Sequence, residues 1–284
     1  MFIKKQKTTI NCKGKLIDLT SPAVMGIINT TPDSFYDGGM NNSIEKAITQ
    51  AEKHTSEGAS IIDIGGYSSR PGAKKVSELE EVGRVIPVIE SILKRFPDTI
   101  ISIDTFRGNV AEKAIEAGAA IINDISAGDI DPTMLDTVIK LNVPYIMMHM
   151  QGTPETMQDN PAYVNIVEEI TYYFSKKINY LKENGVNDII IDPGFGFGKT
   201  MEHNYEMLGK LSHFQLLDVP VLAGLSRKSM IYNLLETDAK GALNGTIAAN
   251  IIALQNRANI LRVHDVKEAV ECVNLDNKPS FQKS

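Results

Sequence analysis

Eight short apolar runs in this 284-residue chain each end at or beside a polar side chain. The runs are rich in Ile and Val and too short for helices, which is typical of buried strands. Carboxylates, amides and imidazoles gathered at strand ends can bind a polar ligand and stabilise charge that develops on it. The polar residues at these ends are Asn29, Asp63, Asp104, Asn123 with Asp124, His149, Asp192, Ser226 and His264.

Residue spacing disfavours two other kinds of chemistry. The chain has no HExxH motif and no Cys/His cluster, and none of the strand-end residues is a cysteine. Covalent thiol catalysis and a zinc site built from protein ligands alone are therefore disfavoured. Positioning and electrostatic stabilisation remain as the expected source of catalysis.

Two glycine-bearing loops follow the first two strands. They read NTTPDSFYDGG from Asn29 and GGYSSRPGA from Gly65. Glycines allow close approach of the backbone to a ligand, and Arg70 in the second loop adds a planar fork suited to phosphate. Arg262 and His264 bring further donors from the last strand. We predict that these groups hold an anionic part of the ligand.

The motif GFGFGKT at positions 194–200 resembles a phosphate-binding loop but has the wrong spacing. Its glycines are too close together for a P-loop, and Lys199 occupies the third glycine position of the dinucleotide pattern. We interpret it as a flexible loop that carries Phe195 and Phe197.

The run SRKS at positions 226–229 leads into an apolar helical segment. Backbone amides at a helix start can bind an anion, so we predict an anion site at Ser229, helped by Lys228. The alternative is an ordinary N-cap.

The elements that must position these groups alternate along the chain. Segments with helical periodicity lie between the strands; Ser43 predicts one helix start, Ser77 with Glu80 a capping box, and residues 163–184 the longest helix. Continuous apolar strands indicate a parallel sheet covered on both faces. Eight strand-then-helix units predict a (β/α)8 TIM barrel, whereas an open doubly wound sheet usually has fewer strands.

Residues 1–20 fit none of these units. The segments TTINC and KLIDL, on either side of Lys13 and Gly14, predict a β-hairpin that covers the bottom of the barrel. The expected organisation is an N-terminal hairpin extension (1–20), a barrel domain (21–274) and a C-terminal tail (275–284).

Composition and charge limit the partners and the compartment. A net charge of −6 and a pI near 5.5 argue against a general binder of nucleic acid or acidic membranes. Cys12 and Cys272 lie near opposite ends of the chain, which favours two unpaired thiols in a reducing compartment. The start of the chain has no apolar stretch behind its basic residues, and no later run approaches a membrane span. We therefore expect a cytoplasmic protein.

The strand-end motifs resemble those of the dihydropteroate synthase family over residues 22 to 270. Seven motifs occur in the order found in that family. They are GIINTTPDSFYDGG, DIGGYSSRPGA, SIDTF, IINDIS, DPGFGFGKT, GLSRKS and RVHD.

The resemblance implies a transferase of alkyl (non-methyl) groups in folate biosynthesis. It would join 6-hydroxymethyl-7,8-dihydropterin diphosphate to 4-aminobenzoate, form 7,8-dihydropteroate and release pyrophosphate, with Mg²⁺ assisting. Carried over from the family, Asp192 would accept paired hydrogen bonds from the pterin, Asn123 and Asp104 would bind its remaining edge nitrogens, and Lys228 its carbonyl oxygen. Arg262 would stack over the ring.

The resemblance also implies how the leaving group is held. Pyrophosphate would lie among Asn29, Arg70 and His264, with Asn29 as the protein ligand of Mg²⁺. Asp37 and Asp104 would stabilise the cation that develops on the pterin methylene. These five residues form the expected catalytic set, and replacing Arg70 should slow the reaction far more than it weakens pterin binding.

The second substrate would contact side chains from several loops. 4-Aminobenzoate would meet Phe35, Ser69, Pro71 and Phe197, with its carboxylate at Ser229. The family commonly has Glu and Thr in GGESTRPG where this chain has Tyr67 and Ser69. The serine keeps the hydroxyl, so we expect function to survive with altered contacts to aminobenzoate and its sulfonamide mimics; Tyr67 has no interpretation from sequence.

Two alternatives and one assembly question stay open. A pterin-dependent methyltransferase of the same barrel superfamily would not need Arg70 or the SRKS run, and a pterin-binding protein without activity would bind the diphosphate without turnover. The family is usually dimeric, and the apolar final helices with Ile247, Ile251 and Ile252 could supply a homodimer interface, although core helices have the same pattern.

Overall fold

The computed structural model describes residues 8–30, 39–67, 76–157 and 160–278, with side chains described from residue 43 in the second range. Its parallel sheet has the strand order β8-β7-β6-β5-β4-β3-β10-β9. A parallel bridge between Ile191 and Val221 joins the two edges, so the sheet closes into a barrel. The strands are β3 (Ala23–Asn29), β4 (Ile61–Gly65), β5 (Ile101–Asp104), β6 (Ile121–Asp124), β7 (Tyr145–Met148), β8 (Ile189–Asp192), β9 (Leu222–Ala223) and β10 (Ile260–Val263).

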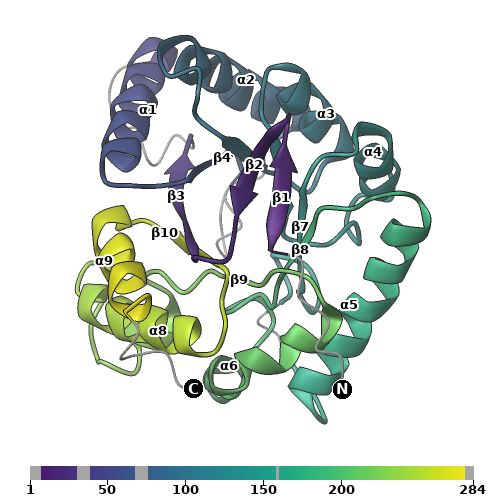
Figure 1. Cartoon of the computed structure of the whole chain (residues 1–284), viewed down its shortest axis with the longest axis vertical. Helices are drawn as coiled ribbons and strands as arrows, with labels where there is room; N and C mark the ends of the chain where they lie inside the picture. The colour runs from purple at the N-terminus through teal and green to yellow at the C-terminus, as the bar shows by residue number, and fades with distance from the viewer. Residues whose placement is uncertain (1–7, 31–38, 68–75, 158–159, 279–284) are drawn as a thin grey trace.

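Helices follow the strands and surround the barrel (Figure 1). The predicted TIM barrel is therefore confirmed. The helices are α1 (Gly39–Ser56), α2 (Glu78–Arg95), α3 (Gly108–Glu116), α4 (Met134–Leu141), α5 (Ile166–Glu183), α6 (Met201–Gly209), the 3-10 helix η2 (Leu211–Leu217), α7 (Ser229–Tyr232), α8 (Leu243–Gln255) and α9 (Val266–Asp276).

One helix start and one half of a capping box differ from the sequence prediction. Helix α1 begins at Gly39, before Ser43, because backbone helix extends beyond the stretch with apolar periodicity. Ser77 caps α2 as predicted by accepting a hydrogen bond from Glu80 N (3.2 Å). The Glu80 carboxylate accepts from Arg84 Nη2 (2.5 Å), so the side-chain half of the predicted box is used elsewhere.

The N-terminal hairpin closes one end of the barrel. Strands β1 (Thr9–Cys12) and β2 (Lys15–Asp18) pair antiparallel, and Lys13 and Gly14 both have positive φ in the tight turn between them. The buried hairpin side chains pack with residues from the amino-terminal parts of the barrel strands in one apolar cluster, and the hairpin crosses the barrel in Figure 1. The prediction of a hairpin over the barrel bottom is confirmed, which leaves the opposite, carboxyl end for chemistry.

Alternation along the strands separates core from site. Ile62 and Ile64 of β4 pack in the large cluster between sheet and helices, as do Ile101 and Ile103 of β5. Side chains of successive strand residues point to opposite faces. Asp63 lies between Ile62 and Ile64, so it and the strand residues two positions away from it point into the barrel.

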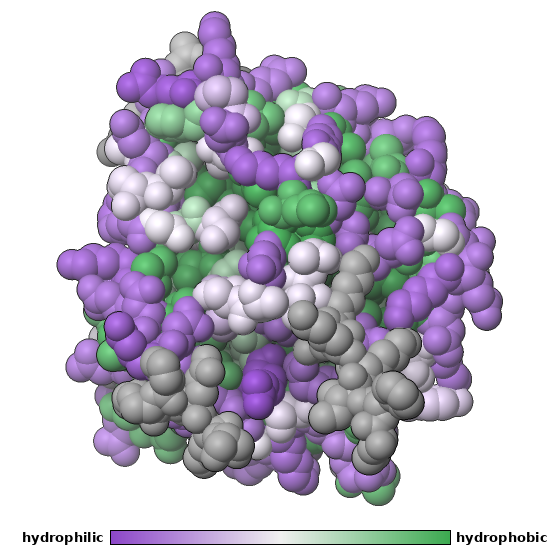
Figure 2. Space-filling view, viewed as in Figure 1, coloured by the Kyte–Doolittle hydropathy of each residue, from purple (hydrophilic) through white to green (hydrophobic). Residues whose placement is uncertain are grey.

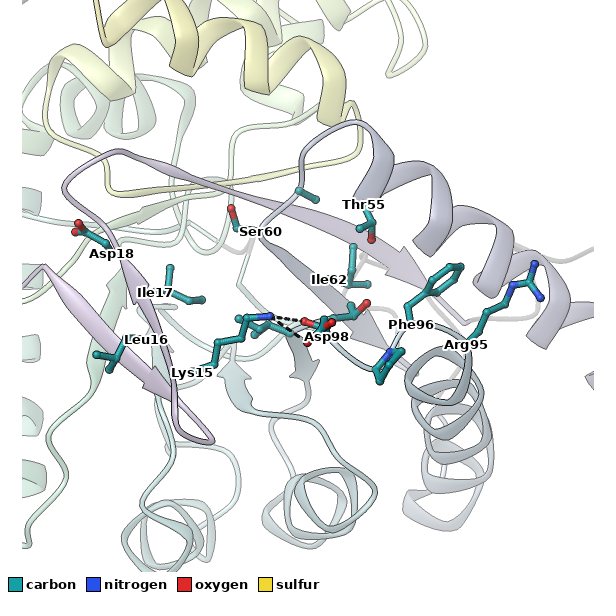
Figure 3. Close-up of a pocket in the computed structure, with 14 residues that line it drawn as sticks. Lys15, Leu16, Ile17, Asp18, Thr55, Ser60, Ile62, Arg95, Phe96 and Asp98 are labelled. Atoms are coloured by element: carbon teal, nitrogen blue, oxygen red, sulfur yellow. Dashed lines mark hydrogen bonds and ion pairs between the residues drawn. The ribbon is translucent and has the colours of Figure 1, made fainter.

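The hairpin end has a cavity of its own. In Figure 2, which shows this face, apolar residues lie toward the middle and hydrophilic residues around the rim. A cavity of about 660 Å³ opens between β2, the end of α1 and the α2–β5 turn (Figure 3). Lys15 points across it to the Asp98 carbonyl (2.9 Å). Its lining contains no histidine or cysteine and lies away from the strand ends that carry the predicted site.

None of the helices in the described part of the chain is long and apolar enough to cross a membrane.

Candidate active site

Charged and polar side chains from four strands meet inside the carboxyl end of the barrel. Arg262 of β10 donates from Nε to Asp63 Oδ2 (2.6 Å) and from Nη2 to Asp104 Oδ2 (2.6 Å). Asn123 of β6 donates from Nδ2 to the same Oδ2 of Asp63 (3.1 Å). Asp63 is fully buried, whereas the side chains of Arg262 and Asp104 keep 22% and 21% of their surface exposed. The network therefore runs from the barrel interior to an accessible surface.

Asp192 and Lys228 approach each other on the other side of the barrel. Asp192 Oδ1 accepts from Gly194 N (2.8 Å). A Cβ atom built on Gly224 would lie 3.7 Å from Asp192 Oδ2 and 3.9 Å from Lys228 Nζ, so the carboxylate and the ammonium both approach this glycine. Gly224 has no side chain, so none is placed between the carboxylate and the ammonium at this position. The structure thus gathers the predicted pterin residues into two groups at one end of the barrel.

Burial moves the pKa values of two of these groups toward neutral pH. Burial, with the nearby charges of Asp63, Glu81 and Asp124, raises the pKa of Asp104 to about 7 against the opposing effect of Arg262. Burial lowers the pKa of Lys228 to about 8, and the Asp192 carboxylate limits that shift. Groups poised near neutral pH in a cleft are typical of functional sites.

The interpretation of the GFGFGKT segment as a flexible loop is wrong. The structure shows the segment anchored to the end of β7. Phe195 is entirely buried. The buried Lys199 Nζ lies 3.1 Å from His149 Nδ1, 3.1 Å from the His149 carbonyl oxygen and 2.8 Å from the Phe197 carbonyl oxygen, and burial lowers the pKa of this lysine well below its usual value. A Cβ on Gly194 would lie 2.0 Å from the His149 carbonyl oxygen, so only glycine fits there.

This anchoring fixes the ring predicted to contact aminobenzoate. The Phe197 ring centroid lies 4.7 Å from Lys228 Nζ, and Lys228 also donates to the Phe195 carbonyl. Phe197 is thereby placed beside the pterin residues, as expected. The sequence did not indicate Lys199 as its support, since the His149 acceptors lie 50 positions away, at the end of β7.

Replacing Lys199 with methionine should lower the free energy of unfolding by about 2–4 kcal/mol, since the carbonyl oxygens of His149 and Phe197 lose their hydrogen-bond donor. Chemical denaturation would measure it. The matched control is Lys210→Met, which removes an exposed lysine that follows α6 and pairs with Glu206 of that helix, and it should change stability by less than about 0.5 kcal/mol. Equal effects of the two substitutions would contradict this role of Lys199.

His264 is oriented by a serine hydroxyl. Ser226 Oγ accepts from the His264 backbone N (3.2 Å) and lies 3.0 Å from His264 Nδ1. Since the hydroxyl already accepts one hydrogen bond, its proton can point to Nδ1, which leaves the proton of the neutral imidazole on Nε2. His264 can then donate a hydrogen bond, as its predicted anion-binding role requires.

Asn29 ends β3 next to Gly65 of β4 in the sheet register, and its side chain is half-buried. Within the described residues, no group of three His, Cys, Asp or Glu side chains could hold a metal ion. A single amide ligand is still compatible with Mg²⁺, which usually keeps several waters and takes oxygens from a bound phosphate.

The other residues of the SRKS run differ in role. Ser229 is the exposed first residue of the four-residue helix α7, and Lys228 occupies the N-cap position, so the alternative of Ser229 as an ordinary N-cap is wrong. Arg227 pairs with both carboxylate oxygens of Asp265 (2.8 Å each) and supports the backbone rather than the site.

Five predicted residues lie outside the described part of the chain: Phe35, Asp37, Ser69, Arg70 and Pro71. Their roles stay predictions.

The structure gives Tyr67 an interpretation that the sequence did not. Its ring packs edge-on against Phe106, with centroids 5.2 Å apart. The Arg107 guanidinium lies 5.5 Å from the Tyr67 centroid, pairs with the buried carboxylate of Glu81 and donates to the Val76 carbonyl (2.8 Å). Tyr67 therefore packs on a cation where the family commonly has a carboxylate.

Comparison with known proteins agrees with this geometry. Residues 25–264 match the family model described as "Pterin binding enzyme", so fold and site define a pterin-binding barrel enzyme. The dihydropteroate synthase of Escherichia coli K12 is 44% identical over 265 residues, which cover 93% of each chain. The chain belongs to the dihydropteroate synthase family.

Two solved structures have the same fold. That of Yersinia pestis dihydropteroate synthase with a sulfonamide drug complex matches with a TM-score of 0.88 and 43% identity, over 94% of this chain and 97% of that one. The Xanthomonas albilineans enzyme in complex with 7,8-dihydropteroate matches with a TM-score of 0.84 and 38% identity over the same shares.

Proposed function

We propose that this protein is a transferase that condenses 6-hydroxymethyl-7,8-dihydropterin diphosphate with 4-aminobenzoate to give 7,8-dihydropteroate and pyrophosphate. The observation that carries this function is the meeting of Asp192 and Lys228 over Gly224, at the same end of the barrel as the Arg262 network. Relatives named dihydropteroate synthase cover nearly the whole chain, so this reaction is favoured over methyl transfer.

The pterin would be bound by complementary hydrogen bonds in the barrel. Asp192 can accept from the 2-amino group and the adjacent ring N–H, because a carboxylate matches two parallel donors. Lys228 can donate to the ring carbonyl oxygen, and Asn123 and Asp104 can bind the remaining edge nitrogens. Arg262 offers the face of its guanidinium to the ring, since both of its carboxylate partners bind the group edge-on through N–H donors.

In the transfer step, the C–O bond from the pterin methylene to the diphosphate breaks and a C–N bond to the arylamine forms. The ammonium that results gives up a proton to water. An arylamine is already neutral near pH 7, so no strong general base is needed. Negative charge on Asp104, with Asp37, would stabilise the positive charge that develops on the pterin.

The leaving group would be bound by Asn29, His264 and Arg70. His264 would donate from Nε2 to a phosphate oxygen, and Asn29 would be the protein ligand of Mg²⁺. Bound Mg²⁺ would neutralise charge on the departing pyrophosphate. Aminobenzoate would contact Phe197, with Phe35, Ser69, Pro71 and Ser229 as the further predicted contacts.

Measuring pyrophosphate release tests the function directly. The purified protein with the pterin diphosphate, 4-aminobenzoate and Mg²⁺ should release one pyrophosphate per dihydropteroate formed. Calorimetry with the pterin diphosphate separates the outcomes, since binding without release would identify a pterin-binding protein that lacks this activity. Omitting Mg²⁺ tests the metal separately.

The pH dependence of kcat/KM for the pterin substrate should be bell-shaped. Activity should rise through pH 7 as Asp104 ionises, because only the carboxylate carries the negative charge that stabilises a cation. Activity should fall above about pH 8 as Lys228 loses the proton it needs for donation. Arg262 and Asp63 face Asp104, and Asp192 and Arg262 face Lys228.

The two limbs can be assigned by substitution. Lys228→Arg should move the alkaline limb to higher pH, since arginine stays protonated. Asp104→Asn should remove the acidic limb at low residual activity. A profile that stays unchanged in both variants would contradict the assignment.

A homodimer and a cytoplasmic location are further parts of the proposal. Of the three predicted interface residues, Ile252 on α8 is 42% exposed, whereas Ile247 and Ile251 pack partly against the core. Leu275 on α9 is also exposed (54%), and α8 and α9 pack together. Both cysteines are free and buried, as expected in a reducing compartment. Sedimentation equilibrium of the wild type and Ile252→Glu would test the interface.

A further inference from the structure

Asp63 is a fully buried charged residue of the site, yet the family resemblance assigns it no specific role in binding or catalysis. It is fully buried in β4, one layer below the strand end, and pairs in register with Ser102 of β5. Two positions further along the two strands, Gly65 of β4 and Asp104 of β5 are the next residues to face inward, and they also pair in register. A buried charge is retained only where strong partners compensate its desolvation.

Both partners of Asp63 are residues that the proposed function uses to bind the pterin. A single oxygen, Oδ2, accepts from Arg262 Nε (2.6 Å) and from Asn123 Nδ2 (3.1 Å). Strands β10 and β4 are separated by β3 in the sheet, so the Arg262 side chain crosses β3 to reach this oxygen. Asp63 therefore links strands that do not pair with each other.

The contact to Arg262 fixes the plane of the guanidinium. Nε binds Asp63 and Nη2 binds Asp104, so two N–H groups are held by carboxylates on adjacent strands. Two such bonds leave the flat group no rotation about its long axis. The face that would stack on the pterin is then set before the ligand arrives, which lowers the cost of binding.

The contact to Asn123 fixes which end of the amide faces the ligand. An ionised carboxylate can only accept hydrogen bonds, so the NH₂ group of Asn123 must face Asp63. The amide oxygen is thereby turned away from Asp63 and can accept from a ring N–H. Without Asp63 the amide could rotate by half a turn and present a donor instead.

We propose that Asp63 is a positioning residue for the pterin: it fixes the plane of Arg262 and the amide orientation of Asn123. This inference rests on the proposed function. Asp63 acts through these two side chains and through the charge that it places beside Asp104; both contacts use Oδ2, and within the described residues Oδ1 is buried without a hydrogen-bond partner.

The test uses Asp63→Asn, which keeps the shape and removes the charge. We expect kcat/KM for the pterin diphosphate to fall about 10–100-fold, with little change in KM for 4-aminobenzoate. The acidic limb of the pH profile should move to lower pH, since Asp63 raises the pKa of Asp104; Arg262, Glu81 and Asp124 are the other charged groups that act on it. A purely structural role would reduce the yield of folded enzyme and leave kcat/KM for the pterin diphosphate, per folded enzyme, at its wild-type value.

Asp63→Glu and Ser102→Ala complete the experiment. The glutamate keeps the charge and moves the oxygen by one methylene, so pterin kcat/KM should fall while the acidic limb stays near its wild-type position. This variant also decides the outcome if Asp63→Asn does not fold. Ser102→Ala is the matched control, since its hydroxyl is buried on the neighbouring strand without a hydrogen-bond partner in the described structure. We expect its kinetics to match the wild type.

The outcomes separate the two levels of the inference. If the wild type releases no pyrophosphate, the proposed function fails. If the wild type is active and Asp63→Asn or Asp63→Glu retains wild-type kcat/KM for the pterin, the positioning role is wrong.

Discussion

Replacing Asp192 with asparagine is expected to lower kcat/KM for the pterin diphosphate by about 10³-fold. The carboxylate would accept two parallel hydrogen bonds from the pterin, and hydrogen bonds to a charged group contribute about 1.5–3 kcal/mol each. Asparagine keeps one acceptor and places an NH₂ group against the second ligand donor. It also leaves the Lys228 ammonium without the opposite charge that supports its protonation.

The measurement is steady-state pyrophosphate release combined with calorimetry of pterin binding. Asp188→Asn is the matched control, because Asp188 lies just before β8 at the hairpin end and accepts from Asn11 N (3.3 Å). The control should retain wild-type kinetics. If Asp192→Asn binds the pterin with wild-type affinity, the orientation proposed for the ligand is wrong.

The barrel could be predicted because its determinants are local. Short Ile- and Val-rich runs of the right length define strands such as β4 and β8 without reference to any partner. Boundaries are less local. The run VLAGL yields only the two-residue strand Leu222–Ala223, because backbone pairing to β10 ends at Ala223 while the chain continues to Ser226.

Residue types in the site were predictable, but their partners were not. Asp63 stands out as a polar residue in an apolar strand, yet its partner Arg262 lies 199 positions away. The glycine-rich segment around Lys199 suggested a flexible loop, because its glycine spacing fits neither phosphate-binding pattern. The burial of Lys199 depends on carbonyl groups at His149 and Phe197, and only the closed barrel brings the first of these near. Every residue has a backbone carbonyl, so the residue type does not show which carbonyl will accept a hydrogen bond from a distant side chain.

Replacing Arg262 with methionine should produce the second large effect, on stability as well as activity. The cation lies between Asp63 and Asp104, so its removal leaves two carboxylates in the barrel without compensation. Breaking a buried ion pair by removing one partner costs about 3–5 kcal/mol of unfolding free energy. Pterin binding should fall by about 10³-fold or more, since the stacking group and the charge balance are lost together.

The control for this substitution is Arg95→Met. Arg95 is exposed at the end of α2, on the hairpin side of the barrel, and its guanidinium lies over the Phe96 ring. Its loss should change the free energy of unfolding by less than about 1 kcal/mol.

The stability deficit of Arg262→Met should also depend on pH in a defined direction. Asp104 has a folded-state pKa of about 7, above the unfolded value of about 3.9, so its ionisation destabilises the folded protein as pH rises between these values. Arg262 lowers this pKa, and removing it extends the destabilisation to higher pH. The deficit relative to wild type should therefore grow as pH rises through 7.

Chemical unfolding of both proteins near pH 6 and near pH 8.5 would measure this difference. Adding Asp104→Asn to each should abolish the pH-dependent part, because the titrating carboxyl is then absent, and leave the part that comes from Asp63. A deficit that stays constant with pH would show that Arg262 stabilises the site by packing and not by its charge.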